Sequence, residues 1–538
     1  MSNRLSQEQE ACLRSGADYE EHYADLLYFL AVAGRWDDFH ALEGVIGQAD
    51  RLAWGVLRLA YEPDDAAAER LCGRVSLAAD PWLAWTLAKY ALARGQSDWA
   101  RAIAEARTAD SGRDVAVWNL IARHCAARGD VPGALDALDA TLESNPHQDH
   151  LAKLRGRLRA GEPSGMPPPD LSLVPATEAV SLCIACADGG AGFAEALDGV
   201  LAQAHPLGAV YAAGQAPPHA AVERHVTVLP GTLREGLRAY FTQSNTPWAG
   251  YVSEAVALAP GYVKCCLMAW ENGPAQTGAL GGRLIEAYTD TPADAWRAAH
   301  LAQDFGNLLL VDPPALHEHS GLYRRKAVLR ANNVPADAAT PEWTVALGEA
   351  LQRAGYRQLY VPDALARHLR RDTTASVLRR KWRWCRPLRE SRGDYADGAA
   401  WLSALPHALS TMVALLNKDI DAGAANLIYL DFLSFFAEAA LDARILVEKQ
   451  LVAPGEAAYI SEALLAGVEY LDDVYGGALR PAVAADLADL GTTPDTPATS
   501  TRHEEALRDL LAQLYATLDT VDDRVYRFLC ASAASTRA

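Results

Sequence analysis

A short run of metal-ligand residue types, His317-Glu318-His319, is the first candidate for chemistry in the chain. In extended backbone, residues two apart point to the same side, so both imidazoles could reach one ion. With His368 and Glu254 they would form a nitrogen and oxygen site for a divalent cation. The alternative is that they are surface or hydrogen-bonded histidines without an ion, because this spacing is common by chance.

A second candidate is a basic segment in an otherwise acidic chain. Arg370 and Arg371 lie in a run over 367–373, and a second run over 379–384 interleaves basic residues with Trp382 and Trp384. Arginine offers bidentate contacts and tryptophan a stacking face, so the segment could clamp a diphosphate or an anionic glycan. Alternatively, it is a basic helix docked against an acidic C-terminal module. The net charge of −19 makes nucleic acid a distant third.

Helical periodicity runs from about residue 18 to 160, which predicts a repeat domain over 1–160. The stretch from Trp85 to Gly95 and Ala100 superposes on the stretch from Asn119 to Gly129 and Ala134, at an offset of 34 residues. This period resembles tetratricopeptide (TPR) repeats, whose helix pairs stack and offer a concave protein-binding surface. A helical bundle without repeats is the alternative.

A Pro- and Gly-rich stretch separates this region from an α/β region. We predict a linker over 161–175, since successive prolines favour extended backbone. An apolar run at 180–185, a helical pattern at 193–203 and a second apolar run at 209–211 then predict a mainly parallel sheet. The α/β domain is expected over 176–392, and an acidic all-α domain over 393–538.

The composition indicates a soluble protein of the reducing cytoplasm. The 538-residue chain has an ordinary charged fraction, and its nine cysteines are too sparse for a disulfide framework. The N-terminus lacks a signal-peptide pattern, and no apolar run reaches the roughly 18 residues of a membrane span.

Over roughly residues 178–390 the chain resembles family 2 glycosyltransferases, which have the Rossmann-like GT-A fold. The supporting segments occur in the family's order: 193–203 with Pro206, 248–252, 258–263, 322–325, 351–356, 360–364 and His368. A further segment, Asp294-Ala295-Trp296-Arg297 with His300, resembles an insertion found in a subset of these enzymes and implies acceptor binding. A plain amphipathic helix is the other interpretation.

The resemblance implies a nucleotide-sugar donor, with Mn²⁺ or Mg²⁺ on its diphosphate and a carboxylate base for the acceptor hydroxyl. The positions that match the family's donor contacts are Asp188, Ala212 and Ala213, and Arg370 and Arg371 would add phosphate contacts. The metal motif matches Ser253-Glu254-Ala255, which has a single carboxylate.

The base position matches Trp343-Thr344, with Glu342 one residue away as the candidate base. His368 stands where the family often has histidine, which makes it a candidate metal ligand with Glu254, and His317 and His319 are further candidates. Most of the expected carboxylates are therefore missing.

Two functions follow from this pattern. One is a catalytically impaired relative, a scaffold in protein or surface-glycan glycosylation that binds a protein or glycan through its repeats. The other is an active transferase with a rebuilt site, acting on a protein recognised by the repeats.

Overall fold

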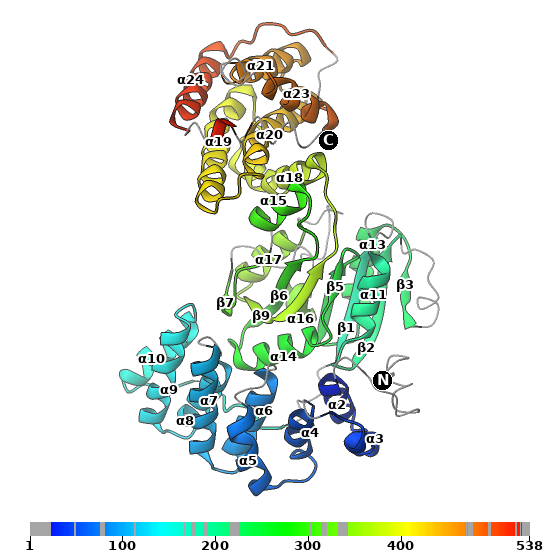
Figure 1. Ribbon diagram of the computed structural model, residues 1–538, viewed down its shortest axis with the longest axis vertical. Coiled ribbons are helices and arrows are strands. Elements are labelled where there is room, and N and C mark those ends of the chain that lie inside the picture. The colour runs from blue at the N-terminus through cyan, green and yellow to red at the C-terminus, as the bar shows by residue number, and fades with distance from the viewer. Residues whose placement is uncertain are drawn as a thin grey trace. The chain divides into compact units, whose positions relative to one another are not determined.

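The computed structural model divides the chain into two compact units, drawn in Figure 1. The sheet unit comprises Met1–Ile285 and Gln303–Leu369, and the helical unit comprises Glu286–Ala302 and Arg370–Ala538. Within them the structure describes residues 23–47, 50–75, 81–111, 115–165, 167–173, 179–186, 192–215, 225–301, 303–313, 320–331, 343–469, 471, 477–492, 496–521, 525–527 and 529. The expected order of a helical region, an α/β region and a second helical region is confirmed.

The N-terminal region of the sheet unit is a row of packed helices, blue to cyan in Figure 1. They are α2 (Tyr23–Val32), α3 (Trp36–Ala41), η1 (Leu42–Gly44), α4 (Arg51–Arg58), α5 (Asp65–Val75), α6 (Pro81–Ala93), α7 (Ser97–Ser111), α8 (Ala116–Ala127), α9 (Val131–Ser144) and α10 (Asp149–Arg159). Gly95 and Gly129 follow α6 and α8 with φ of 74° and 77°, a conformation that favours glycine. Ala100 and Ala134 are fully buried, so the next helix of each pair packs closely.

The sheet has the order β3-β2-β1-β4-β8-β6-β9-β5, with β7 paired to β9. Its strands are β1 (Val180–Cys186), β2 (Leu207–Gly214), β3 (Thr227–Leu229), β4 (Trp248–Ser253), β5 (Val256–Leu258), β6 (Thr277–Glu286), β7 (Leu310–Val311), β8 (Ser320–Arg324) and β9 (Arg357–His368). Strands β3, β2, β1 and β4 are mutually parallel, whereas β8 is antiparallel to β4 and β6, and β9 to β5 and β7.

The prediction of a mainly parallel sheet is therefore wrong, because the sheet is mixed. Its parallel half follows the strand-helix-strand pattern seen in the sequence. A helix of the right length between strands allows the crossover that parallel pairing needs. Strand β5 instead follows β4 within a few residues and pairs with the distant β9.

Helices cover both faces of the parallel strands: α11 (Phe193–Leu201) and α14 (Tyr262–Asn272) on one, and α13 (Leu233–Gln243), α16 (Arg325–Ala331) and α17 (Trp343–Arg353) on the other. Along β1, Leu182 and Ile184 join the first core, and Cys183 and Ala185 the second. A strand buried on both faces must be apolar throughout, which explains the unbroken apolar run at 180–185.

The N-terminal helices are packed onto the sheet region rather than held away from it by the linker. Lys89 Nζ lies 2.9 Å from Glu271 Oε2, and Trp85 Nε1 donates to Asn272 Oδ1 at 3.2 Å. Lys264 Nζ pairs with Asp25 at 2.8 Å. These contacts join α2 and α6 to α14, so the division groups the region expected as a separate domain over 1–160 with the sheet.

The helical unit is built around α20 (Ile428–Glu448), most of whose residues are buried. Its other helices are α15 (Pro292–His300), α18 (Thr374–Arg392), α19 (Gly398–Asp421), α21 (Pro454–Ala466), α23 (Leu479–Asp489) and α24 (Glu504–Thr520). The division falls after Leu369, whereas the sequence placed a boundary at 392/393. The reason is that α18 shares a core with α20 through Val377 and Leu378.

One helix among the described residues, α19, is long and apolar enough by composition to cross a membrane. In the structure its apolar residues Trp401, Leu405 and Met412 are buried in the core of the helical unit. A polar carboxylate, Asp419, is buried in its last turn. One face of α19 therefore packs in the core of the helical unit.

Candidate functional site

The carboxyl ends of β1 and β4 form the first candidate site. The chain passes from β1 outward to β2 and β3, then returns to place β4 on the other side of β1. In open α/β sheets, ligands bind in the crevice at such a reversal of strand order. Glu254 directly follows β4, and its amide donates to the Ala185 carbonyl of β1 at 3.0 Å.

Glu254 and His368 are brought to one corner of the sheet. His368 pairs with Val256, and the Leu369 amide donates to the Ala255 carbonyl at 2.8 Å. Both residues are buried, with 3% and 1% of their surface exposed. Burial, assisted by the nearby Glu254 charge, raises the pKa of the Cys186 thiol to about 12. This corner therefore holds one carboxylate and one imidazole in a region of low polarity.

The matching donor positions on β2, Ala212 and Ala213, are fully buried. Ala212 lies in the core on one face of the sheet and Ala213 in the core on the other. A Cβ atom built on Gly236 of α13 would lie only 2.8 Å from the Ala213 Cβ, so helix and strand are in close contact there. These methyl groups fill space in the core and offer no hydrogen-bonding group.

Four predicted site residues, Asp188, His317, His319 and Glu342, lie outside the described residues. The base position next to Glu342 falls at the start of α17, where Thr344 is buried.

Arg370 and Arg371 belong to the helical unit, where carboxylates already balance their charges. Arg370 Nε donates to Asp372 Oδ1 at 3.2 Å. Arg371 pairs with Asp290 and lies 3.8 Å from the ring centroid of Tyr288. The first basic run thus connects the segment before α15 to the segment before α18.

The second basic run, over 379–384, packs against α20. This agrees with the interpretation of the run as a basic helix docked on the C-terminal module. Trp382 Nε1 of this run donates to Asp442 Oδ1 at 2.8 Å, and farther along the same helix Arg389 Nη1 donates to Glu438 Oε1 at 2.6 Å. Both of these α18 side chains are buried. Thr373 caps the helix by accepting from the Ser376 amide, and Gly393, with φ of 81°, ends it. The acidic partners expected in the C-terminal module are therefore Asp442 and Glu438, both on α20.

The segment that resembles the insertion forms α15, which Thr291 caps and which has Pro292 at its first position. Arg297 is buried among three carboxylates: Asp294 at 2.7 Å, Asp372 at 2.7 Å and Glu286 at 2.8 Å. Trp296 is fully buried in the helical core. The segment is therefore a helix of the helical unit. Its polar residues Asp294 and Arg297 are buried and pair with each other and with neighbouring carboxylates.

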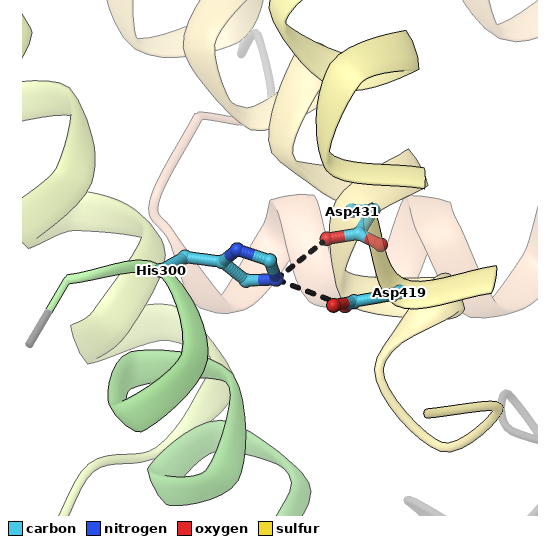
Figure 2. Close-up of side chains that lie close together, drawn as sticks. All are labelled: His300, Asp419 and Asp431. Carbon is cyan, nitrogen blue, oxygen red and sulfur yellow. Dashed lines mark hydrogen bonds and ion pairs between the residues drawn. The ribbon is translucent and has the colours of Figure 1, made fainter. Parts of the chain in front are cut away.

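A buried cluster, here termed the His–Asp–Asp centre, joins α15 to α19 and α20 (Figure 2). His300 Nε2 lies 2.9 Å from Asp419 Oδ2 and 3.5 Å from Asp431 Oδ1. The three side chains are at most 2% exposed. Trp296 Nε1 donates to Asp431 Oδ1 at 2.7 Å. An imidazole nitrogen and two carboxylate oxygens converge on one point, which suits either a metal ion or a shared proton.

Burial in this centre favours the neutral forms of Asp431 and His300. Burial raises the pKa of Asp431 to about 8, against the Trp296 hydrogen bond, and the Asp419 carboxylate adds to the rise. Burial also lowers the pKa of His300, although Asp419 opposes this. The sequence signal for the centre was weak, because His300 and Asp419 are 119 residues apart.

A cavity of about 220 Å³ lies in the sheet unit where α8 meets α14. Asn119 and Gln148 line it from the N-terminal helices, and Asn272 and Asp363 from the sheet region. Asn119 Nδ2 donates to Gln148 Oε1 at 3.1 Å, while Asn119 Oδ1 and Gln148 Nε2 have no partner among the described residues. One acceptor and one donor therefore remain for a ligand with amide groups or for water.

Comparisons with known proteins identify no family for the chain. No family model matches it, and no curated protein does. Among solved structures, a crystal structure of a mycobacterial protein aligns at 12% identity over 40% of this chain and 75% of that chain, with a TM-score of 0.29.

Proposed function

We propose that the chain is a glycosyltransferase family 2-like protein that has lost ordinary metal-dependent sugar transfer and acts as a partner-binding scaffold in protein or surface-glycan glycosylation. The observation that carries the proposal is the burial of Ala212 and Ala213 where the family's donor-binding carboxylates would stand. A methyl group packed in a core cannot accept a hydrogen bond from a nucleoside.

The family's metal ion does not fit the residues at the end of β4. A divalent cation on a diphosphate needs several hard oxygen ligands. Ser253-Glu254-Ala255 supplies one carboxylate, and that carboxylate is buried. A donor diphosphate would therefore lack the charge neutralisation that lets it leave.

The partner-binding part of the proposal rests on the N-terminal helices. As TPR-like repeats they would supply a concave surface for a protein segment. The cavity between α8 and α14 offers an acceptor on Asn119 and a donor on Gln148 that have no partner in the described part of the chain, and together they match a backbone amide. Ion pairs from α2 and α6 to α14 hold these helices, and so the cavity, against the sheet region.

The first experiment measures binding of a panel of nucleotide sugars to the full chain, with and without Mn²⁺. Calorimetry and thermal shift report the binding. We expect no stabilisation by any donor. Stabilisation that requires Mn²⁺ would overturn the proposal in favour of an active site.

The second experiment tests partner binding. The wild-type full chain and the Asn119→Leu variant are each used as bait in a pull-down, and the bound proteins and glycans are compared. A specific partner should be lost with Asn119→Leu. The exposed Asp98→Asn on α7 serves as the control and should retain it. Recovery of no protein partner, together with no glycan binding, would count against a scaffold.

One observation favours a second candidate, an active transferase that uses Mn²⁺ or Mg²⁺ and a nucleotide sugar. Glu254 and His368 lie at one corner of the sheet, next to the reversal of strand order. Asp188 and Glu342, which lie outside the described residues, are the other candidate site residues. In that case Glu254→Gln abolishes turnover while Glu195→Gln, an exposed control on α11, leaves it unchanged. Unchanged turnover in Glu254→Gln would remove this candidate.

We also propose a cytoplasmic location. The described cysteines are thiols, as expected in a reducing compartment.

A further inference from the structure

The His–Asp–Asp centre of the helical unit has ligand atoms at distances that suit a small divalent ion. The candidate ligand atoms of His300, Asp419 and Asp431 all lie within 4.8 Å of one another. Around a tetrahedral ion with bonds of about 2.0–2.2 Å, ligand atoms lie about 3.3–3.6 Å apart. The His300–Asp431 separation of 3.5 Å meets this condition, and the His300–Asp419 separation of 2.9 Å needs a small side-chain adjustment.

The charges in the centre leave room for a cation. Two carboxylates are buried there beside one imidazole, and taking an ionised carboxylate out of water is costly unless an opposite charge balances it. Among the described residues, no lysine or arginine pairs with Asp419 or Asp431. The charges of Lys381 and Lys418 act on the centre from a distance. Each lysine has its own partners: Lys381 contacts Ser434 and Glu438, and Lys418 donates to the Ala299 carbonyl.

Two further features match a metal centre. Asp431 Oδ2 is buried and has no hydrogen-bond partner in the described part of the chain, so this carboxylate is not fully satisfied by the protein. Trp296 Nε1 donates at 2.7 Å to Oδ1, the same oxygen that faces His300. Ligating carboxylates commonly accept such an outer hydrogen bond, which orients them toward the ion.

We propose that His300, Asp419 and Asp431 bind a divalent transition-metal ion of the Zn²⁺ type. Imidazole nitrogen with carboxylate oxygen is a donor set that suits zinc and its neighbours rather than calcium. The ion ties α15 to the end of α19 and the start of α20, three elements that are far apart in the sequence. Because the centre is buried, the ion is structural. The proposal does not depend on any glycosyltransferase function.

The first test is elemental analysis of the full chain purified without added metal. We expect about one equivalent of a transition metal per chain. The chain is then stripped with a chelator and titrated with Zn²⁺ while its unfolding is followed by thermal shift. At a hundredfold excess of Zn²⁺ over its Kd, the Tm of the helical unit should rise by about 5–10 °C.

The variants Asp419→Asn and His300→Gln should abolish the Zn²⁺-dependent rise. Asp486→Asn is the matched control in the same unit, because Asp486 accepts a hydrogen bond from Tyr429 at 2.7 Å but lies outside the centre. It should keep the full rise. In the stripped wild-type chain, Co²⁺ should give the visible absorption of cobalt bound by nitrogen and oxygen ligands. This measurement does not depend on whether any variant folds.

A proton shared between Asp419 and Asp431 gives a different pattern. The wild-type chain then contains no metal, gains no stability from Zn²⁺ and shows no Co²⁺ absorption, and Asp419→Asn is as stable as wild type because an amide replaces the protonated carboxyl. That pattern would overturn the proposal. A Zn²⁺-dependent rise that survives in Asp419→Asn and His300→Gln would overturn it as well, by placing the ion elsewhere.

Discussion

Replacing Arg297 with methionine should strongly destabilise the helical unit. The guanidinium is 1% exposed and contacts carboxylates of Glu286, Asp294 and Asp372 at 2.7–2.8 Å. Methionine has a similar length and keeps the apolar packing, so the change isolates the loss of positive charge. The three buried carboxylates would then lose the guanidinium that they all contact.

The expected size of the effect follows from what each carboxylate retains. Asp372 keeps contacts with Arg380 at 3.1 Å and Arg370 at 3.2 Å, and Asp294 keeps the Asp372 amide at 2.8 Å. Glu286 loses its ion pair, and burial already raises the pKa of this residue. Breaking a buried pair typically costs 3–5 kcal/mol, and we expect about 3 kcal/mol because two of the three carboxylates remain partnered.

Arg371→Met is the matched control. Arg371 is 51% exposed and pairs with Asp290, which is 65% exposed, so its loss should cost less than about 1 kcal/mol. Hydrogen exchange measured by mass spectrometry on peptides of α18 reports the stability of the helical unit separately from the sheet unit. Lowering the pH from 7.5 to 5 should reduce the Arg297→Met cost, because protonation of Glu286 removes the unbalanced charge. Equal costs for the two variants would refute the reasoning.

Two further predictions concern the sheet unit. Burial, followed by the nearby Arg357 and Arg123 charges, lowers the pKa of His150 to about 4. The folded state therefore favours the neutral ring, so stability is complete above pH 6.5 and is lost as the pH falls toward 4. Urea unfolding measures the drop in the free energy of unfolding between pH 7.5 and pH 4.5. This drop should be about 2–3 kcal/mol smaller in His150→Gln than in the wild type, and an equal drop in both would contradict the prediction. Gly282→Ala places a Cβ 2.0 Å from the Ala364 carbonyl oxygen, so it should lower the stability of the sheet unit by about 2 kcal/mol or more. Gly156→Ala lies at an open helical position and should raise the stability by about 0.5–1 kcal/mol. Thermal unfolding of the two variants measures the difference.

The sequence by itself determined the local elements. Helical periodicity and the 34-residue offset placed the N-terminal helices, and Gly95 and Gly129 have the left-handed backbone typical of the turn that ends a helix. The apolar run at 180–185 became β1, buried on both faces. These features depend on residues close in the chain, since turn conformation and side-chain periodicity are local properties.

Tertiary structure decided which of these elements belong together. The sequence left two interpretations of the basic run over 379–384, a clamp for a diphosphate or anionic glycan and a docked basic helix. Packing of this helix against α20 pairs Trp382 with Asp442. The sheet is mixed because β5 pairs with the distant β9. Neither pairing has a local signal in the chain.

The candidate sites show the same division. Sequence order placed Glu254 directly after a strand, and the fold then brought His368 to the same corner. The His–Asp–Asp centre combines a residue of α15 with residues more than a hundred positions later, and no spacing rule connects them. Such a centre exists because three helices bury their apolar faces in one core, which brings the polar groups at the ends of α15, α19 and the start of α20 to the same buried point.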